Sequence, residues 1–433
     1  MSKRSGNRAS PSSSATALPH SGNIADFVLP NGVRLLVYEN RATPSVVVQG
    51  YLRVGGIDEP PEQRGLADFT AACLLRGTAS FTYAELFERV ESVGAAVRIA
   101  GGVTLTSFAA RGLREDIPLM LDVLAEALRQ PTFPEEEVAR EHAEWIAELK
   151  ERENDARAVC DLTFAALCYP EQHPFHHPVE GYLHTAQRIT REDVQRFHAH
   201  YYAPQGMVIA AVGDVRAETM LRWVEARFAD WRAERPPQPS VPPAPPLAEQ
   251  RRQHVALPGK VQTELALGFP GPSQRDEDWL TCVLMNNILG VFGMYGRLGA
   301  RVRKLRGLVY QIGSRFVGGE GPAPWVLSAS TAPEMVEGVV QLALEEIRRL
   351  QTRRVSAREL ADNKMALIGS LPMYLETNAG IADAILGMVR YERGLDWLCV
   401  MPERIRSITA AEIQAAACKW LSAERFALAT CGP

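Results

Sequence analysis

A basic segment followed by a strand-like segment carries the residues of this 433-residue chain that are best suited to stabilising a reacting group. Residues 299–306 predict a helix that includes Arg303, and residues 308–312 predict a strand that includes Tyr310, seven positions further on. A fixed guanidinium and a phenol hydroxyl can both stabilise a developing oxyanion. The same residues also fit a structural role, because a cation complements the dipole at a helix C-terminus and a strand tyrosine commonly packs.

A second segment, Gly65 to Thr78, follows an acidic, proline-rich loop and is made largely of small and apolar residues. It predicts a buried helix that ends at Gly77, which would act as its C-cap. Its one carboxylate is Asp68, and the residues three and four positions later are Ala71 and Ala72. Residues at this spacing share one helix face. Two methyl groups there can neither bind a metal nor accept a proton.

This segment resembles the signature helix of the pitrilysin/insulinase family, in which Gly-Leu-Ala-His-Phe-x-Glu-His-x-Leu-x-x-Gly-Thr places two zinc ligands and a catalytic glutamate on one face. The residues of the frame are shared, namely Gly65, Leu66, Ala67, Phe69, Leu74, Gly77 and Thr78. Asp68, however, stands at the first histidine position, Ala71 at the glutamate and Ala72 at the second histidine. Since catalytic zinc needs three protein ligands and an open position for water, we expect no metal on this chain.

The resemblance also implies roles for residues elsewhere in the chain. Glu148 stands where the family has its third zinc ligand, although it is also one of many acids on a charged helix. Arg303 and Tyr310 match the family pattern Leu-Arg-x-x-x-Gly-Leu-x-Tyr, whose Arg and Tyr bind the substrate carbonyl beside the scissile bond. Residues 96–100 correspond to the edge strand on which family members bind substrate as an added strand. The family commonly has Asn-Ala there, whereas this chain has Arg-Ile at 98–99, which weakens that expectation.

Three histidines in one short loop form the other group that suggests metal binding: His173, His176 and His177. Adjacent side chains diverge in an extended loop, and the family has a similar loop at this place. We therefore expect no metal there either, and we assign no catalytic residue and no cofactor to this chain alone. Any zinc is expected on a partner chain.

The elements that must position these residues repeat along the chain. Residues 189–213 align with residues 408–432 at an offset of 219, and Glu137 aligns with Glu359 at an offset of 222. Each half mixes hairpin strands with long helices, which predicts an α+β fold of two tandem homologous domains, each a mostly antiparallel sheet packed with helices. The resemblance implies the LuxS/MPP-like metallopeptidase fold. The predicted parts are a disordered tail (1–22), an N-terminal domain (23–232), a proline-rich linker (233–250) and a C-terminal domain (251–433).

Composition excludes several other classes of protein. The net charge of −4 provides no basic surface for nucleic acid, and no apolar run approaches the ~20 residues of a membrane span. Residues 1–22 are basic and rich in serine but lack the apolar core of a secretory signal. The seven scattered cysteines, with no Cys-x-x-Cys pair, fit reduced thiols. We expect a cytoplasmic protein with neither a nucleic-acid nor a membrane partner.

One functional expectation and two alternatives follow. We expect a chain that is inactive alone and forms the non-catalytic subunit of a heterodimeric zinc metallopeptidase with a zinc-binding paralogous subunit. Arg303 and Tyr310 would then bind the peptide substrate and stabilise the oxyanion at the partner's zinc. The first alternative is a non-enzymatic structural or peptide-holding family member. The second is a homodimer that uses an unrecognised metal site, although the sequence has no further histidine cluster with ligand spacing.

Overall fold

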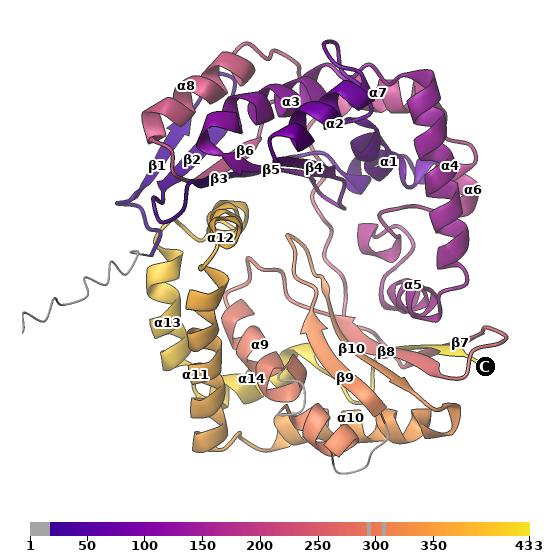
Figure 1. Cartoon of the computed structure of the whole chain (residues 1–433). Helices are drawn as coiled ribbons and strands as arrows, with labels where there is room; N and C mark the ends of the chain where they lie inside the picture. Colours follow the sequence, from indigo (N-terminus) through magenta and orange to yellow (C-terminus); the bar gives the residue numbers. More distant parts are fainter. Residues whose placement is uncertain (1–17, 292–295, 305–308) are drawn as a thin grey trace, which may run out of the picture.

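The computed structural model of this protein describes residues 18–291, 296–304 and 309–433. Two β-sheets, each with its own set of helices, lie one above the other in Figure 1. We refer to residues 18–232 as the N-terminal half and to residues 251–433 as the C-terminal half. Both halves combine a mostly antiparallel sheet with long helices, so the predicted α+β class is confirmed.

The N-terminal half contains a six-stranded sheet in the order β1-β2-β6-β3-β5-β4, in which β2 and β6 are parallel and all other neighbours are antiparallel. Its strands are β1 (Ile24–Val28), β2 (Arg34–Glu39), β3 (Ser45–Leu52), β4 (Ala96–Ala100), β5 (Thr106–Leu113) and β6 (Val208–Gly213). Its helices are α1 (Leu66–Cys73), α2 (Tyr83–Ser92), α3 (Ile117–Arg129), α4 (Glu135–Arg152), α5 (Ala156–Cys168), α6 (Leu183–Ala186), α7 (Arg191–Tyr201) and α8 (Ala217–Phe228).

The C-terminal half contains a five-stranded sheet in the order β7-β11-β8-β10-β9, with β7 and β11 parallel and the rest antiparallel. Its strands are β7 (Arg251–Ala256), β8 (Thr263–Pro270), β9 (Val309–Phe316), β10 (Pro324–Thr331) and β11 (Ala427–Gly432). Its helices are α9 (Trp279–Asn286), α10 (Val336–Thr352), α11 (Ala357–Tyr374), α12 (Asn378–Arg390), α13 (Trp397–Ser407) and α14 (Ala410–Trp420), with π-helical turns at Asn287–Val291 and Gly299–Lys304. Within the described ranges, no helix combines the length and apolar character needed to cross a membrane.

The two sheets have the same topology once β1 is set aside. Each contains one parallel pair, β2 with β6 and β7 with β11, followed by three strands in antiparallel order. Helices α4 and α11 both have 18 residues and begin 222 positions apart, at Glu135 and Ala357. Helices α5 and α12 both have 13 residues, and they begin at the same offset, at Ala156 and Asn378. The predicted internal repeat is therefore confirmed.

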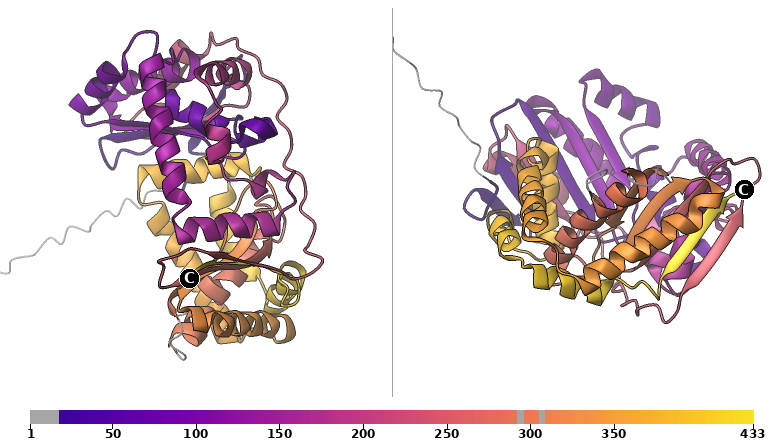
Figure 2. Two further views of the ribbon diagram at one scale, coloured as in Figure 1. Left: turned by 90° about the vertical axis from the view of Figure 1, so that its right-hand side faces the viewer. Right: turned by 90° about the horizontal axis from the view of Figure 1, so that it is seen from below.

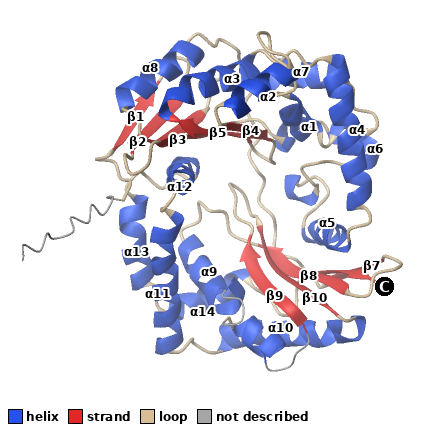
Figure 3. Cartoon of the chain, in the orientation of Figure 1, coloured by secondary structure: helices blue, strands red, loops and turns tan. Residues whose placement is uncertain are grey.

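Each sheet is covered on one face by helices of its own half and on the other by one helix of the opposite half. Helix α12 packs against β3 and β6 of the N-terminal sheet, and α5 packs against β8 and β11 of the C-terminal sheet. Figure 3 places α12 and α5 between the two sheets, with most other helices on the outside. The buried side chains of α12 include Ile381, Ile385 and Met388, and those of α5 include Cys160 and Phe164.

We call this reciprocal covering of each sheet by a helix of the opposite half the helix exchange. Because strand side chains alternate between the two faces of a sheet, the helix exchange requires apolar residues on both faces of the strands it covers. In β2, Leu35 and Val37 pack with the helices of the N-terminal half, whereas Leu36 and Tyr38 pack with α12. The central strands β2 and β6 are buried on both faces. They are therefore almost continuously apolar and lack the alternation of a half-exposed strand.

The connection between the halves, residues 233–250, contains neither helix nor strand and runs along one side of the molecule (Figure 2). Its prolines have no N–H to donate to a sheet, which keeps this segment out of both sheets. It is nevertheless attached at defined points. The Gln238 amide donates to the Thr104 carbonyl at 2.6 Å, and the Pro242 carbonyl lies 3.0 Å from Nε2 of His173.

The helix predicted over residues 65–78 is shorter than expected, because α1 ends at Cys73. Gly77, expected as its C-cap, instead forms a β-bridge with Thr82 and has a φ of +153°. A Cβ atom at Gly77 would lie 2.8 Å from the ring of Pro134. The glycine is therefore required by this close approach and not by the helix terminus.

The helix exchange predicts that the two halves unfold together. Phe164→Ala and Ile385→Ala truncate buried side chains of α5 and α12, and each should cost about 2–5 kcal/mol. Chemical denaturation followed by circular dichroism should still give one transition, shifted in both variants, whereas Met365→Ala on the exposed surface of α11 should shift it little. Two separate transitions, with each variant affecting only one of them, would contradict the shared core.

Candidate functional site

Helix α1 is held at its N-terminus by an acid from the preceding loop. Gly65, at the N-cap, has a φ of +98° and offers no side chain to cap the helix. The Glu59 carboxylate accepts from the Gly65 amide at 3.1 Å and from the Ala67 amide at 2.6 Å, so it satisfies two of the four free donors of the helix. Burial raises the pKa of Glu59 to about 8, although these two amides lower it.

Asp68, one turn into α1, lies in a region of negative potential. Burial is the main cause that raises the pKa of its carboxyl to about 6, and the nearby charges of Glu180 and Glu148 raise it further. A hydrogen bond from the Gly101 amide acts in the opposite direction. A Cβ atom on Gly101 would lie 2.6 Å from Cα of Asp68, so only glycine lets the end of β4 approach α1 this closely. The charge of Glu148, which the resemblance places at the third ligand position, thus acts on the Asp68 carboxyl.

The residues at this place do not fit zinc. Ala71 is only 1% exposed and is packed in the core, and Ala72 also ends in a methyl group. Cys73 is fully buried, and burial raises the pKa of its thiol to about 12, so it is no substitute ligand. In the described part of the chain, no group of three or more His, Cys, Asp or Glu side chains is arranged to hold a metal ion. We therefore derive no chemistry through a metal on this chain.

The three histidines of the 173–177 loop are bonded to backbone oxygens. His173 Nε2 lies 3.0 Å from the Pro242 carbonyl, His176 Nδ1 lies 2.9 Å from the Tyr169 carbonyl, and His177 Nε2 lies 2.7 Å from the Glu171 carbonyl. Burial is the main cause that lowers the pKa of His173 and His177. These imidazoles hold the loop and the interdomain connection in place.

Arg303 and Tyr310 lie in two consecutive elements of the C-terminal half that contact each other. Arg303 belongs to the π-helical turn Gly299–Lys304, and Tyr310 belongs to β9. Residues 305–308, where the predicted helix would end and the predicted strand begin, lie outside the described residues. Arg301, two positions before Arg303, forms ion pairs with Glu345 and Glu346 of α10.

Both strands that the resemblance connects with substrate lie at sheet edges. Among the described residues, strand β4 pairs only with β5, and β9 pairs only with β10. The backbone of an edge strand can accept a further strand. The prediction that residues 96–100 form an edge strand is correct, and β9 occupies the equivalent position in the second sheet.

The fold and this site define a metallopeptidase-like protein that lacks the ligands of its metal centre. The family described as "Insulinase (Peptidase family M16)" matches residues 35–171, and the one described as "Peptidase M16 inactive domain" matches residues 188–367. The chain belongs to the pitrilysin/insulinase peptidase family, M16, as a member without the zinc-binding residues of His-x-x-Glu-His.

Individual relatives match over nearly the whole chain. An uncharacterized zinc protease of Streptomyces coelicolor is 26% identical over 95% of this chain and 90% of its own length. The crystal structure of a peptidase M16 inactive domain from Pseudomonas fluorescens superimposes with a TM-score of 0.87 at 25% identity, covering 95% of this chain and 98% of that one. A protease from Helicobacter pylori shares the fold with the same TM-score at 18% identity, over 96% of this chain and 100% of that one.

Three residues that shape the site escaped the sequence analysis. Glu59 could have been found as an acid ahead of a helix that lacks a capping side chain. Gly101 follows a predicted strand, which is a common place for close backbone approach. Glu180 had no signal in the neighbouring sequence, because it is far from Asp68 along the chain and its charge acts on Asp68 only in the folded protein.

The raised pKa of Asp68 predicts that the free energy of unfolding depends on pH. Because the folded-state pKa of about 6 exceeds the reference value of 3.8, the folded state binds more protons between these values, and stability falls as pH rises through this window. Asp68→Asn should therefore be more stable than the parent by about 1–3 kcal/mol at pH 7.5 and equally stable near pH 4. Urea denaturation at both pH values measures this. Glu151→Gln, on an exposed part of α4, is the control, and a gain that is the same at both pH values would contradict the assignment.

The proximity of Asp68 and Glu148 predicts that a zinc site can be rebuilt with two substitutions. Asp68→His and Ala72→His together place two imidazoles four positions apart on α1, and the charge of Glu148 reaches position 68. Position 71 is left unchanged, because a buried glutamate there would be costly. Only the double variant should retain about one zinc per chain after dialysis, and adding Glu148→Gln should abolish this. A folded double variant without zinc would show that Glu148 is wrongly placed for a third ligand.

Proposed function

We propose that this chain is the non-catalytic subunit of a heterodimeric zinc metallopeptidase, paired with a family member that retains His-x-x-Glu-His. The observation that carries the proposal is the contrast between the halves. At α1 the position of the catalytic base is an alanine buried in the core, whereas the C-terminal half keeps the Arg and Tyr of the family pattern. A chain with this combination needs a second chain to supply the metal.

In this proposal the C-terminal half binds substrate. The free edge of β9 accepts a peptide segment through backbone hydrogen bonds, as edge strands do. Arg303 and Tyr310 then bind the carbonyl next to the scissile bond and stabilise the charge that develops on its oxygen. Zinc on the partner would supply a Lewis acid and an activated water.

We place this assembly in the cytoplasm. Support comes from the cysteines: all seven are free, and five of them, Cys73, Cys160, Cys168, Cys282 and Cys431, are buried. Thiols of this kind persist where the surroundings are reducing.

A non-enzymatic family member that holds peptides or supports an assembly remains the second candidate. It is favoured by the same loss of zinc residues and requires no role for Arg303 or Tyr310. The two candidates differ in what these side chains do once the partner is present.

The decisive variants are Arg303→Ala and Tyr310→Phe in the reconstituted pair. If both groups stabilise the oxyanion, each variant should lower kcat by about 100- to 1000-fold for loss of one preorganised donor, without loss of assembly. The measurement is steady-state hydrolysis of a quenched fluorescent peptide, with assembly followed by size-exclusion chromatography.

Arg315→Ala provides the matched control, because it removes an exposed cation from the same strand as Tyr310. This variant should hydrolyse the peptide as the parent pair does. Unchanged turnover in both Arg303→Ala and Tyr310→Phe would reject the shared-site role and favour the non-enzymatic candidate.

A further inference from the structure

The tips of the two edge hairpins meet between the halves. The turn at 101–105 joins β4 to β5, and the turn at 317–323 joins β9 to β10. Figure 1 shows the β9–β10 hairpin reaching toward the N-terminal half. Both turns line one cavity of about 360 Å³. Because each turn continues an edge strand, this contact sets the spacing between β4 and β9.

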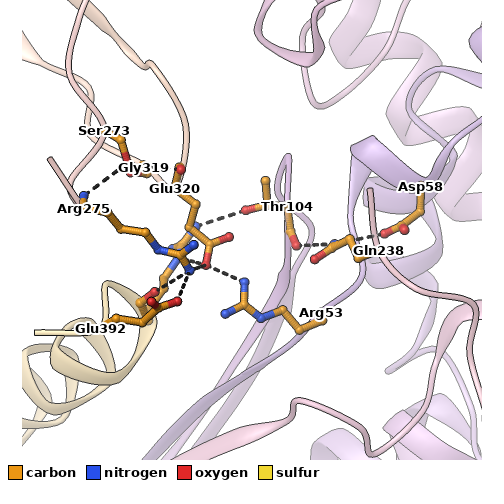
Figure 4. A network of polar contacts seen from close by, with 10 residues as sticks. Arg53, Asp58, Thr104, Gln238, Ser273, Arg275, Gly319, Glu320 and Glu392 are labelled. Carbon is orange, nitrogen blue, oxygen red and sulfur yellow. Dashed lines mark hydrogen bonds and ion pairs between the residues drawn. The ribbon is translucent and has the colours of Figure 1, made fainter. Parts of the chain in front are cut away.

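One buried acid lies at the centre of this contact. The Glu320 side chain, in the 317–323 turn, is 8% exposed, and its Oε1 faces three guanidinium groups (Figure 4). Nη1 of Arg53 is 2.5 Å away, Nη2 of Arg275 is 3.5 Å away, and Nε of Arg390 is 3.8 Å away. Arg53 follows β3 of the N-terminal half, and Arg390 ends the exchanged helix α12.

Without the Glu320 carboxylate, the three arginines around it would lack a buried anion to compensate their positive charges. The other acid in the group, Glu392, is 71% exposed, and its ion pair is with Arg275. Nε of Arg390 is buried and has no hydrogen-bond partner among the described residues. Removing the charge of Glu320 would leave Arg53 and Arg390 close together without a compensating anion. Loss of one partner from a buried ion pair is strongly destabilising for this reason.

The same cluster is connected to the other hairpin tip. Arg390 donates to the Thr104 hydroxyl at 3.2 Å. The Thr104 carbonyl accepts from Gln238 of the interdomain connection, which also donates to buried Asp58 at 3.2 Å. The network therefore extends from the β9–β10 turn to the loop that leads into α1.

We propose that Glu320 is an electrostatic latch that holds the β9–β10 hairpin on the N-terminal half and so fixes the spacing between the edge strands β4 and β9. The latch acts through three cations from both halves that share one buried carboxylate. It does not depend on a substrate-binding role for Arg303 or Tyr310.

Hydrogen exchange followed by mass spectrometry of the whole chain tests this latch. In Glu320→Gln, amides in 317–323 and 101–105 should exchange about tenfold faster or more, since the hairpin tips separate while both sheets remain folded. The Gln274 amide, which donates to the Gly319 carbonyl at 3.0 Å, should follow them. Strands β2, β6, β8 and β11 should exchange as in the parent chain.

Glu392→Gln is the matched control, because it removes an exposed acid from the same arginine group and should leave both tips unchanged. If Glu320→Gln does not fold, Arg53→Gln replaces it and should accelerate exchange at the same tips to a smaller extent. Parent-like exchange at the tips would overturn the proposal. A uniform acceleration across both sheets would also overturn it, because Glu320 would then be a general stability contact.

Discussion

The burial of each sheet by a helix from the other half is the constraint on which the rest of this structure depends. A mostly antiparallel sheet can leave one face in water, but the central strands β2 and β6 here are apolar on both faces. Helices α5 and α12 supply the missing cover in a reciprocal manner. Each half therefore needs a helix of the other half to cover its sheet, and the two repeated halves share one packed interior.

This exchange also fixes where the two edge strands can lie. Helix α12 ends at Arg390, and its guanidinium lies beside Glu320 of the β9–β10 turn and Thr104 of the β4–β5 turn. Helix α12, which packs on the N-terminal sheet, therefore also places the Arg390 guanidinium where the two hairpin turns meet. Helix packing and ion pairing therefore act on the same contact between the two hairpin turns. This contact connects the core of the protein with the spacing between the edge strands β4 and β9.

The absence of the family's metal-site residues involves the hydrophobic core as well as the surface. Ala71 is packed at the position of the family's catalytic base, while Asp68 and Glu148 still lie close to each other. Burial raises the pKa of Asp68, and the charges of Glu180 and Glu148 raise it further. The ionised Asp68 carboxylate therefore lowers the stability of the fold at neutral pH.

Much of this could be predicted from the sequence, and the rest could not for physical reasons. The α+β class and the repeat follow from periodicity and spacing, whereas the edge strand at 96–100 was implied by the family resemblance. The apolar face of α12 could be recognised in the same way, but periodicity does not tell which sheet a helix covers. Glu320 had no local signal of its importance, because its arginine partners are brought to it by the fold. Glu59 did have one, as an acid ahead of a helix that lacks a capping side chain, but it was overlooked. Strand β1 lies just after the predicted tail and was also missed.

The most direct test of the central claim is a titration of this chain into a fixed concentration of a paralogue from the same organism that carries His-x-x-Glu-His, with hydrolysis of a quenched fluorescent peptide as the signal. Our account predicts no hydrolysis by this chain alone, little by the paralogue alone, and a rate that rises with added chain and levels off near equimolar amounts. A paralogue that is fully active without this chain, or hydrolysis by this chain alone, would contradict it.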